Sequence, residues 1–214
     1  MLYSFEIEKY LENLLPERDG LLQEMEEAAL RETIPVVTPA VGNFLAWLVR
    51  TSKAARILEI GTAIGYSTIW LARAAEVNNG HVTTIDMNLA RRQEASNYFD
   101  RSGLFGRITS LAGDARKILP GLAGPFDLVF IDAAKGEYLE YFNLVQRLIK
   151  PGGMLVVDNV LFRGWVVPGA EFEPKYVRIV NSLRDFLQEL NNHPDFSTSV
   201  LPLGDGLSLS IKKV

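Results

Sequence analysis

The sequence predicts an α/β fold in which a mostly parallel β-sheet is covered by helices on both faces. Two observations predict it. From Arg56 onward, short apolar segments alternate with amphipathic ones, which is typical of parallel strands joined by crossover helices. The 214 residues, 48% of them hydrophobic, are enough for one buried core and few for two full domains. We therefore expect a single domain over residues 1–214, with a helical cap at 1–53 and the core at 54–214.

The N-terminal region is predicted to be helical. Apolar residues recur at helical spacing over Glu6–Leu15 and Leu21–Glu32, and Pro16 and Gly20 separate these two segments. A third apolar segment, Ala40–Ser52, continues as a helix up to the first strand.

The core is predicted to contain five strands and then an antiparallel pair. We expect the strands at residues 56–61, 81–86, 107–113, 126–132 and 154–159. The helices that follow them are expected at 67–76, 89–103, 115–122, 136–150 and, after a long loop at 160–174, 175–193. The segments 196–203 and 207–214 flank the turn Gly204-Asp205-Gly206 and predict the antiparallel pair.

Polar residues gather at the ends of the predicted strands, where sheets of this class bind ligands. Asp86 ends the second strand, Asp132 ends the fourth, and Asp158 and Asn159 end the fifth. Taken alone, Asp132 and the nearby Lys135 are better explained by an incidental ion pair in a solvated loop. Their position at this edge of the sheet favours a functional role.

The first strand ends in LEIGTAIGYST, which contains Glu59, Gly61 and Gly65. Glycine after a strand allows the backbone to approach a ligand closely and to turn into a helix. The spacing is G-x-x-x-G and not the G-x-G-x-x-G of dinucleotide enzymes, so a diphosphate against the helix is not favoured. The turn instead suits a nucleoside that carries an amino acid.

Two further acids extend this interpretation. Asp86 is placed to accept hydrogen bonds from both ribose hydroxyls. Asp114, after the third strand, is placed to meet an adenine amino group, although a helix cap is an equally good explanation for it alone. Together, acids at the ends of consecutive strands favour S-adenosylmethionine as the ligand.

Five segments together resemble a known family. LEIGTAIGYST, the acid of the second strand, GDA, FIDAAKGEY and VVDNVLFRG are similar to the cation-dependent O-methyltransferases, which include the catechol and caffeoyl-coenzyme A enzymes and many bacterial relatives. The resemblance extends from about Thr33 to the end. It implies a Rossmann-like methyltransferase fold, with a seven-stranded, mostly parallel sheet, an antiparallel C-terminal strand and an N-terminal helical cap.

The resemblance also implies the site residues. The family's metal ligands correspond to Asp132, Asp158 and Asn159, and its catalytic lysine corresponds to Lys135. Its cofactor contacts correspond to Val37, Glu59, Gly61, Thr62, Ser67, Asp86, Ala115 and Asp132. The glycine turn and the strand ends add Gly65 and Asp114 to this set.

The chemistry of these residue types agrees with the resemblance. Two carboxylates and an amide oxygen form a hard, all-oxygen partial shell suited to Mg²⁺, or to another divalent cation such as Ca²⁺ or Mn²⁺. A hydroxyl bound to a dication loses its proton more readily. The same charge favours the neutral amine of Lys135, which we expect to take that proton.

The methyl acceptor must offer two adjacent oxygens to chelate the metal. Catechols and caffeoyl groups do so, and so does 5-hydroxyuridine. The segments DNVLFRG, NNHPDF and LPLGDGLSLSIKK resemble the bacterial branch that contains the tRNA 5-hydroxyuridine methyltransferase, so we expect the tRNA wobble position slightly ahead of a small phenol. In the long loop, Arg163 and Trp165 are the candidate substrate contacts.

Charge gives the tRNA interpretation mixed support. The net charge of −4 argues against a large nucleic-acid footprint. Several basic residues are nevertheless candidates for phosphate contacts, and ordinary solvated surface is at least as good an explanation for each: Arg91, Arg92, Arg163, Lys175, Arg178, Lys212 and Lys213.

Other function classes and properties follow from what the sequence lacks. No apolar run of about 18 residues is present, so we expect no membrane span. Zero cysteines exclude disulfides and fit a cytoplasmic protein. Leu11, Leu14 and Leu15 favour a homodimer.

Two alternative functions remain. A dinucleotide oxidoreductase would use the same sheet, but it does not fit the glycine spacing. A non-catalytic S-adenosylmethionine-binding module would leave Lys135 and the metal ligands without a purpose.

Overall fold

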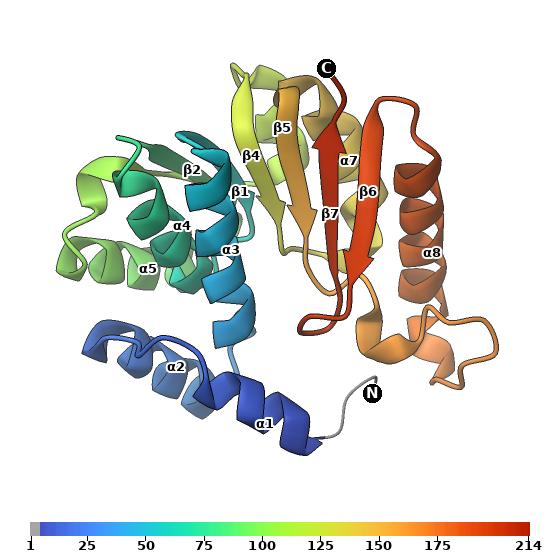
Figure 1. Cartoon of the computed structure of the whole chain (residues 1–214), viewed down its shortest axis with the longest axis horizontal. Coiled ribbons are helices and arrows are strands. Elements are labelled where there is room, and N and C mark those ends of the chain that lie inside the picture. Colours follow the sequence, from blue (N-terminus) through green and yellow to red (C-terminus); the bar gives the residue numbers. More distant parts are fainter. Residues whose placement is uncertain (1–4) are drawn as a thin grey trace. The chain divides into compact units, whose positions relative to one another are not determined.

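A computed structural model describes residues 5–214, which form two compact units, one up to Asp114 and one from Ala115 (Figure 1). The described chain has seven strands, in the order β3-β2-β1 within the first unit and β4-β5-β7-β6 within the second. All strand pairs within the units are parallel except those made by β7. The predicted mostly parallel α/β fold with an antiparallel C-terminal strand is confirmed.

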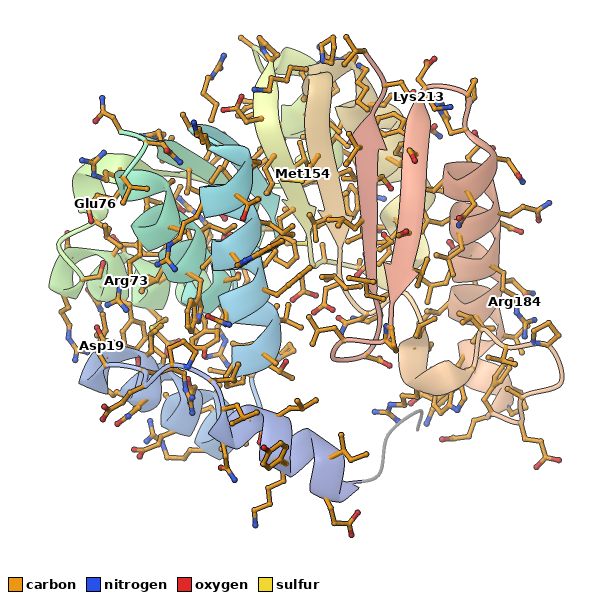
Figure 2. All side chains as sticks on the ribbon, in the orientation of Figure 1. Asp19, Arg73, Glu76, Met154, Arg184 and Lys213 are labelled. Atoms are coloured by element: carbon orange, nitrogen blue, oxygen red, sulfur yellow. The ribbon has the colours of Figure 1, made fainter. Side chains whose placement is uncertain are left out.

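The first unit begins with three helices whose ends are capped as the sequence chemistry requires. They are α1 (Phe5–Asn13), α2 (Gly20–Glu32) and α3 (Pro39–Ser52). The side chain of Asp19 accepts a hydrogen bond from the amide of Leu22 at 3.1 Å, and Thr38 caps α3 in the same way. In Figure 2, Asp19 also marks the start of α2, where its carboxylate forms a 2.6 Å ion pair with Arg73.

Three parallel strands form the sheet of this unit. They are β1 (Arg56–Ile60), β2 (His81–Asp86) and β3 (Ile108–Ala112), and the helices between them are α4 (Tyr66–Glu76) and α5 (Leu89–Arg101). Helix α4 packs closely on α3, because a Cβ at Gly42 would lie 2.6 Å from Nε1 of Trp70. The residues of β1 after Arg56 are all buried, and so are Val82, Thr84 and Ile85 of β2, whereas the edge strand β3 is buried only at Ile108.

The second unit holds four strands side by side, β4 (Phe126–Ile131), β5 (Ile149–Val157), β7 (Leu207–Lys212) and β6 (Phe196–Leu201), as Figure 1 shows. Its helices are α6 (Ala115–Ile118), α7 (Tyr138–Val145) and α8 (Val177–Asn192). The rings of Phe142, Phe186 and Phe196 meet edge to face between these helices and the sheet.

Short 3₁₀ helices complete both units. They are η1 (Phe105–Arg107), η2 (Leu119–Gly121), η3 (Lys135–Glu137), η4 (Gln146–Leu148), η5 (Phe162–Gly164) and η6 (Pro174–Tyr176). In the part of the chain that is described, no helix is both long enough and apolar enough to cross a membrane.

Two predicted boundaries were wrong in the second unit. The helix expected to run to Lys150 ends at Val145, and β5 starts at Ile149 instead of Met154. Pro151, Gly152 and Gly153 fall between the predicted helix at 136–150 and the predicted strand at 154–159. In the structure they lie within β5, where the pairing with β4 shifts register between Phe126 and Leu128. Such an irregularity accommodates a proline that cannot donate to the ladder.

Candidate active site

The turn after β1 is shaped by its glycines. Gly61 and Gly65 have φ values of 102° and 88°, a conformation that side-chain-bearing residues rarely adopt. A Cβ at Gly65 would also lie 2.5 Å from Cε1 of Phe99. Glycine is therefore required at 65 both by conformation and by space, and the G-x-x-x-G spacing has a local structural cause.

Asp86 holds the backbone of this turn. Its Oδ2 accepts hydrogen bonds from the amides of Thr62 at 3.0 Å and Ala63 at 2.9 Å, and its Oδ1 accepts one from Asn88 at 2.8 Å. The sequence predicted a contact between Asp86 and ribose hydroxyls, which stays a prediction. The structure adds a role that sequence reasoning missed, because a side-chain bond to a turn 23 or 24 residues earlier leaves no local pattern.

Glu59 is fully buried and its carboxylate is surrounded by hydroxyl groups. Ser67 and Thr84 each donate to it at 2.6 Å, and Thr68 donates as well. The hydroxyl of Thr84 also lies 2.6 Å from that of Thr62. These bonds tie the first turn of α4 to β1 and β2, which satisfies a buried charge that would otherwise be costly. A contact between Glu59 and a cofactor stays a prediction.

The other predicted cofactor residues lie in both units. Val37, between α2 and α3, is buried, as is Ala115 at the start of α6. Asp114 is half-buried at the end of the first unit, one residue before Ala115.

The predicted metal ligands lie together at one edge of the second unit's sheet. Asp132 directly follows β4, and Asp158 and Asn159 directly follow β5. The last residues of these parallel strands, Ile131 and Val157, are paired in register, and the amide of Asp158 donates to the carbonyl of Ile131 at 3.0 Å. Strand register therefore brings the ends that carry the two carboxylates side by side, as the sequence predicted.

Two buried acids raise each other's negative potential at this edge of the sheet, and Lys135 offsets part of that effect. Burial, and then the negative charge of Asp132, raise the pKa of Asp158 to about 7. Burial raises the pKa of Asp132 as well, while Lys135 acts in the opposite direction on both. Lys135 starts η3, three residues after Asp132.

Hydrogen bonds fix the backbone at Asp158 and Asn159, two of the predicted metal ligands. Tyr138 is completely buried, and its hydroxyl donates to the carbonyl oxygen of Asp158 at 3.0 Å. Asn159 adopts φ 56°, and its backbone amide donates to Oδ1 of Asp158 at 2.7 Å. In the sequence, Tyr138 is only the last residue of FIDAAKGEY, and nothing there indicates this contact, because its partner lies 20 residues further on, directly after β5.

The predicted donor set is suited to a hard cation. It consists of two carboxylates and one amide oxygen, which Mg²⁺ and Ca²⁺ prefer, with further positions left for water and acceptor. Among residues 5–214, no cluster of three or more His, Cys, Asp or Glu side chains forms a metal site.

The loop after the ligands carries the predicted substrate contacts. The ring of Trp165 lies 5.1 Å from that of Phe162 and 4.9 Å from that of Tyr176, measured between centroids. The guanidinium carbon of Arg163 lies 5.2 Å from the centre of the Trp165 ring. The structure brings Arg163 and Trp165 together, although the acceptor contact itself is untested.

One cavity of about 260 Å³ lies elsewhere, among α2, α3 and α4 of the first unit. None of the predicted site residues lines it. Two of its arginines, Arg18 and Arg73, are already in ion pairs, with Glu26 at 2.7 Å and Asp19 at 2.6 Å. We attribute this cavity to imperfect helix packing.

Comparison with known proteins agrees with the fold. Residues 14–213 match the family model described as O-methyltransferase. The chain is 35% identical to a catechol O-methyltransferase of Niastella koreensis, covering 97% of this chain and 96% of that protein, and 31% identical to a caffeoyl-CoA O-methyltransferase of Eucalyptus gunnii, covering 97% and 86%. The crystal structure of TomG from Streptomyces achromogenes, in complex with SAM, is similar with a TM-score of 0.86 and 31% identity, over 98% of this chain and 96% of that one. The chain belongs to the O-methyltransferase family.

Proposed function

We propose that the chain transfers the methyl group of S-adenosylmethionine to a hydroxyl of a small phenol that chelates a divalent cation, such as a catechol or a caffeoyl group. The observation that carries this proposal is the placement of Asp132, Asp158 and Asn159 at the paired ends of β4 and β5. Relatives named for catechol and caffeoyl-CoA methylation support the acceptor class. The SAM complex of TomG supports the donor.

A divalent cation fits the chemistry of this edge. The two acids are buried enough for their pKa values to be raised, and a cation between them would relieve the repulsion that favours protonation. When bound, such an ion makes the acceptor hydroxyl a stronger acid. Asp132, Asp158 and Asn159 are the residues that would hold it.

Lys135 is the proposed base. The transfer forms an oxygen–methyl bond and breaks the sulfur–methyl bond of the donor, which leaves as S-adenosylhomocysteine. The hydroxyl proton goes to the amine of Lys135. The influence of Lys135 on the pKa values of Asp132 and Asp158 supports its proximity to the site.

The sequence slightly favours a tRNA acceptor over a small phenol. The contacts of the basic residues in the structure give the tRNA acceptor less support. Most of the candidate phosphate contacts are engaged within the protein. Arg91 pairs with Glu32 and Glu94, Arg92 bonds to Ser110, Lys175 pairs with Glu173, and Lys212 and Lys213 donate to backbone carbonyls. Contacts of this kind leave few free cations for a phosphate backbone.

The test offers labelled S-adenosylmethionine to the purified protein with catechol, caffeic acid or hypomodified tRNA. We expect label in the phenols, loss of transfer after treatment with EDTA, and recovery when Mg²⁺ is added back. Guaiacol, a catechol with one oxygen already methylated, is the matched control and should accept poorly. Label found only in tRNA, or transfer that survives EDTA, would overturn the proposal.

A further inference from the structure

The segment directly after the metal-ligand positions has an unfavourable backbone. Phe162, Arg163 and Gly164 are consecutive residues with φ values of 44°, 60° and 78°. For residues other than glycine, this left-handed conformation costs roughly 1–2 kcal/mol each. A segment of this kind keeps one conformation only if the surrounding structure holds it.

The turn between β6 and β7 holds the first half of the segment. The carbonyls of Asp205 and Gly206 accept from the amides of Leu161 at 3.0 Å and Val160 at 2.9 Å. The half-buried carboxylate of Asp205 accepts from the amide of Arg163 at 2.5 Å. The contact is so close that a side chain at position 206 would overlap Leu161, and Gly206 has φ 89°.

An arginine of α8 holds the second half. Nε of Arg184 donates to the carbonyl of Val166 at 2.9 Å, and the guanidinium also donates to the carbonyls of Trp165 at 3.2 Å and Val167 at 3.1 Å. Figure 2 shows Arg184 projecting from α8 toward this loop. The rigid fork of a guanidinium suits several carbonyls at once, which an ammonium does not match.

We propose that Asp205 and Arg184 are positioning residues for the methyl acceptor, which hold residues 160–167 as a preformed platform beside the metal-ligand positions. The inference rests on the proposed function, since it assigns the acceptor to the loop that carries Arg163 and Trp165. The two anchors act on opposite ends of the loop and on opposite backbone groups, an amide at one end and carbonyls at the other. Preorganisation of this kind lowers the entropy that acceptor binding must remove.

The first test measures the loop itself. Hydrogen–deuterium exchange of residues 160–168 is compared among the wild type, Asp205→Ala and Arg184→Ala, without any substrate. We expect exchange at least tenfold faster in both variants, and Asp205→Asn, which keeps an acceptor oxygen, should restore most of the protection. Asp195→Ala and Gln188→Ala, exposed positions in the same unit, are the matched controls.

The second test measures kinetics with catechol. Both alanine variants should raise KM for the acceptor about tenfold or more, with a smaller change in kcat and with unchanged binding of S-adenosylmethionine. Unchanged exchange in both variants, or an acceptor KM that stays at the wild-type value, would overturn the inference. The exchange experiment needs no turnover. A wild-type protein that fails to methylate phenols would therefore refute the proposed function, whereas the exchange rates would still show whether Asp205 and Arg184 hold the loop.

Discussion

At the residue scale, Lys135 is the side chain on which the proposed chemistry depends most. Lys135→Ala should lower kcat by about 10²–10⁴-fold, the usual contribution of a general base. Lys135→Arg keeps the positive charge but cannot lose a proton near neutral pH, so it should be equally impaired. Turnover is measured with catechol at saturating Mg²⁺.

Chemical rescue separates the base from a structural role of Lys135. Small primary amines added to Lys135→Ala should restore part of the activity, and they should not help Lys135→Arg, whose side chain fills the space. Near-normal turnover of Lys135→Ala without any added amine would contradict the assignment.

Asp158 makes stability depend on pH. Its pKa rises from 3.8 to about 7 on folding, so between these values the folded protein binds more protons than the unfolded chain. The free energy of unfolding of cation-free protein should therefore fall as pH rises from about 4 to 7, by at most about 1.4 kcal/mol per pH unit for one group. Denaturation in EDTA at several pH values measures this slope.

The control for that slope is Asp158→Asn, which removes this titrating group and should reduce the slope, while Asp132, whose pKa burial also raises, keeps part of it. Mg²⁺ added at pH 8, where the carboxylate is charged, should restore stability to the wild type and have little effect on Asp158→Asn. A wild-type stability that does not depend on pH between 4 and 7 would show that folding does not raise the pKa of Asp158.

Tyr138 should support the ligand pair through the backbone. Tyr138→Phe keeps the buried ring and removes the hydroxyl that donates to the carbonyl of Asp158, so we expect a loss of about 1 kcal/mol in the free energy of unfolding. Mn²⁺ binding, followed by electron paramagnetic resonance, should weaken several-fold. Tyr141→Phe, whose hydroxyl bonds to Glu137, is the matched control and should leave Mn²⁺ binding unchanged. Equal affinity in wild type and Tyr138→Phe would refute this role.

Sequence reasoning identified the residues that carry charge at strand ends, and missed those that act through the backbone. Asp132 and Asp158 are recognisable because each directly follows an apolar strand. Tyr138, Arg184 and Asp205 resemble ordinary packing or surface residues, and their partners are distant in the chain. Nothing in their local sequence distinguishes them before the strands and helices are placed.

At the scale of elements, the hydroxyls around Glu59 connect α4 to β1 and β2. Thr84→Val replaces a fully buried hydroxyl with a methyl group and removes its bonds to Glu59 and Thr62, so we expect a loss of about 1–3 kcal/mol in the free energy of unfolding. Thr84→Ser keeps the hydroxyl and should lose less. Urea denaturation of both variants measures the difference, and a Thr84→Val variant as stable as the wild type would mean that the hydroxyl of Thr84 does not stabilise the fold.

Most helices and strands could be predicted from the sequence. The boundary errors occur where the local sequence and the pairing between strands indicate different structures. The alternation of strands and helices predicted the elements, and the apolar sequences of β4 and of the end of β5 agree with their burial. The start of β5 was misplaced because Pro151, Gly152 and Gly153 ordinarily end a strand. Here they form part of a strand with a register shift, which depends on pairing with β4.

At the scale of the whole molecule, exposed apolar residues in and just after the N-terminal helix α1 indicate that the chain forms a homodimer. Ile7 and Leu11 of α1 are 45% and 50% exposed and lie on one side of the helix, and Leu14, just after its end, is 62% exposed, whereas Leu15 is half-buried. We expect a homodimer that buries this row. Light scattering should give twice the mass of the chain for the wild type and for Leu30→Asp, an exposed position on α2, and the mass of one chain for Leu11→Asp. A monomeric wild type would refute the prediction.

The setting of Trp165 gives the protein an optical reporter of its own. The indole is surrounded by the guanidinium of Arg163 and the rings of Phe162 and Tyr176, in the segment where the acceptor is proposed to bind. Indole emission shifts with the polarity and the charges around the ring. A phenol that enters this loop should therefore change the emission of Trp165, and its arrival becomes visible in a stopped-flow fluorimeter without any added dye.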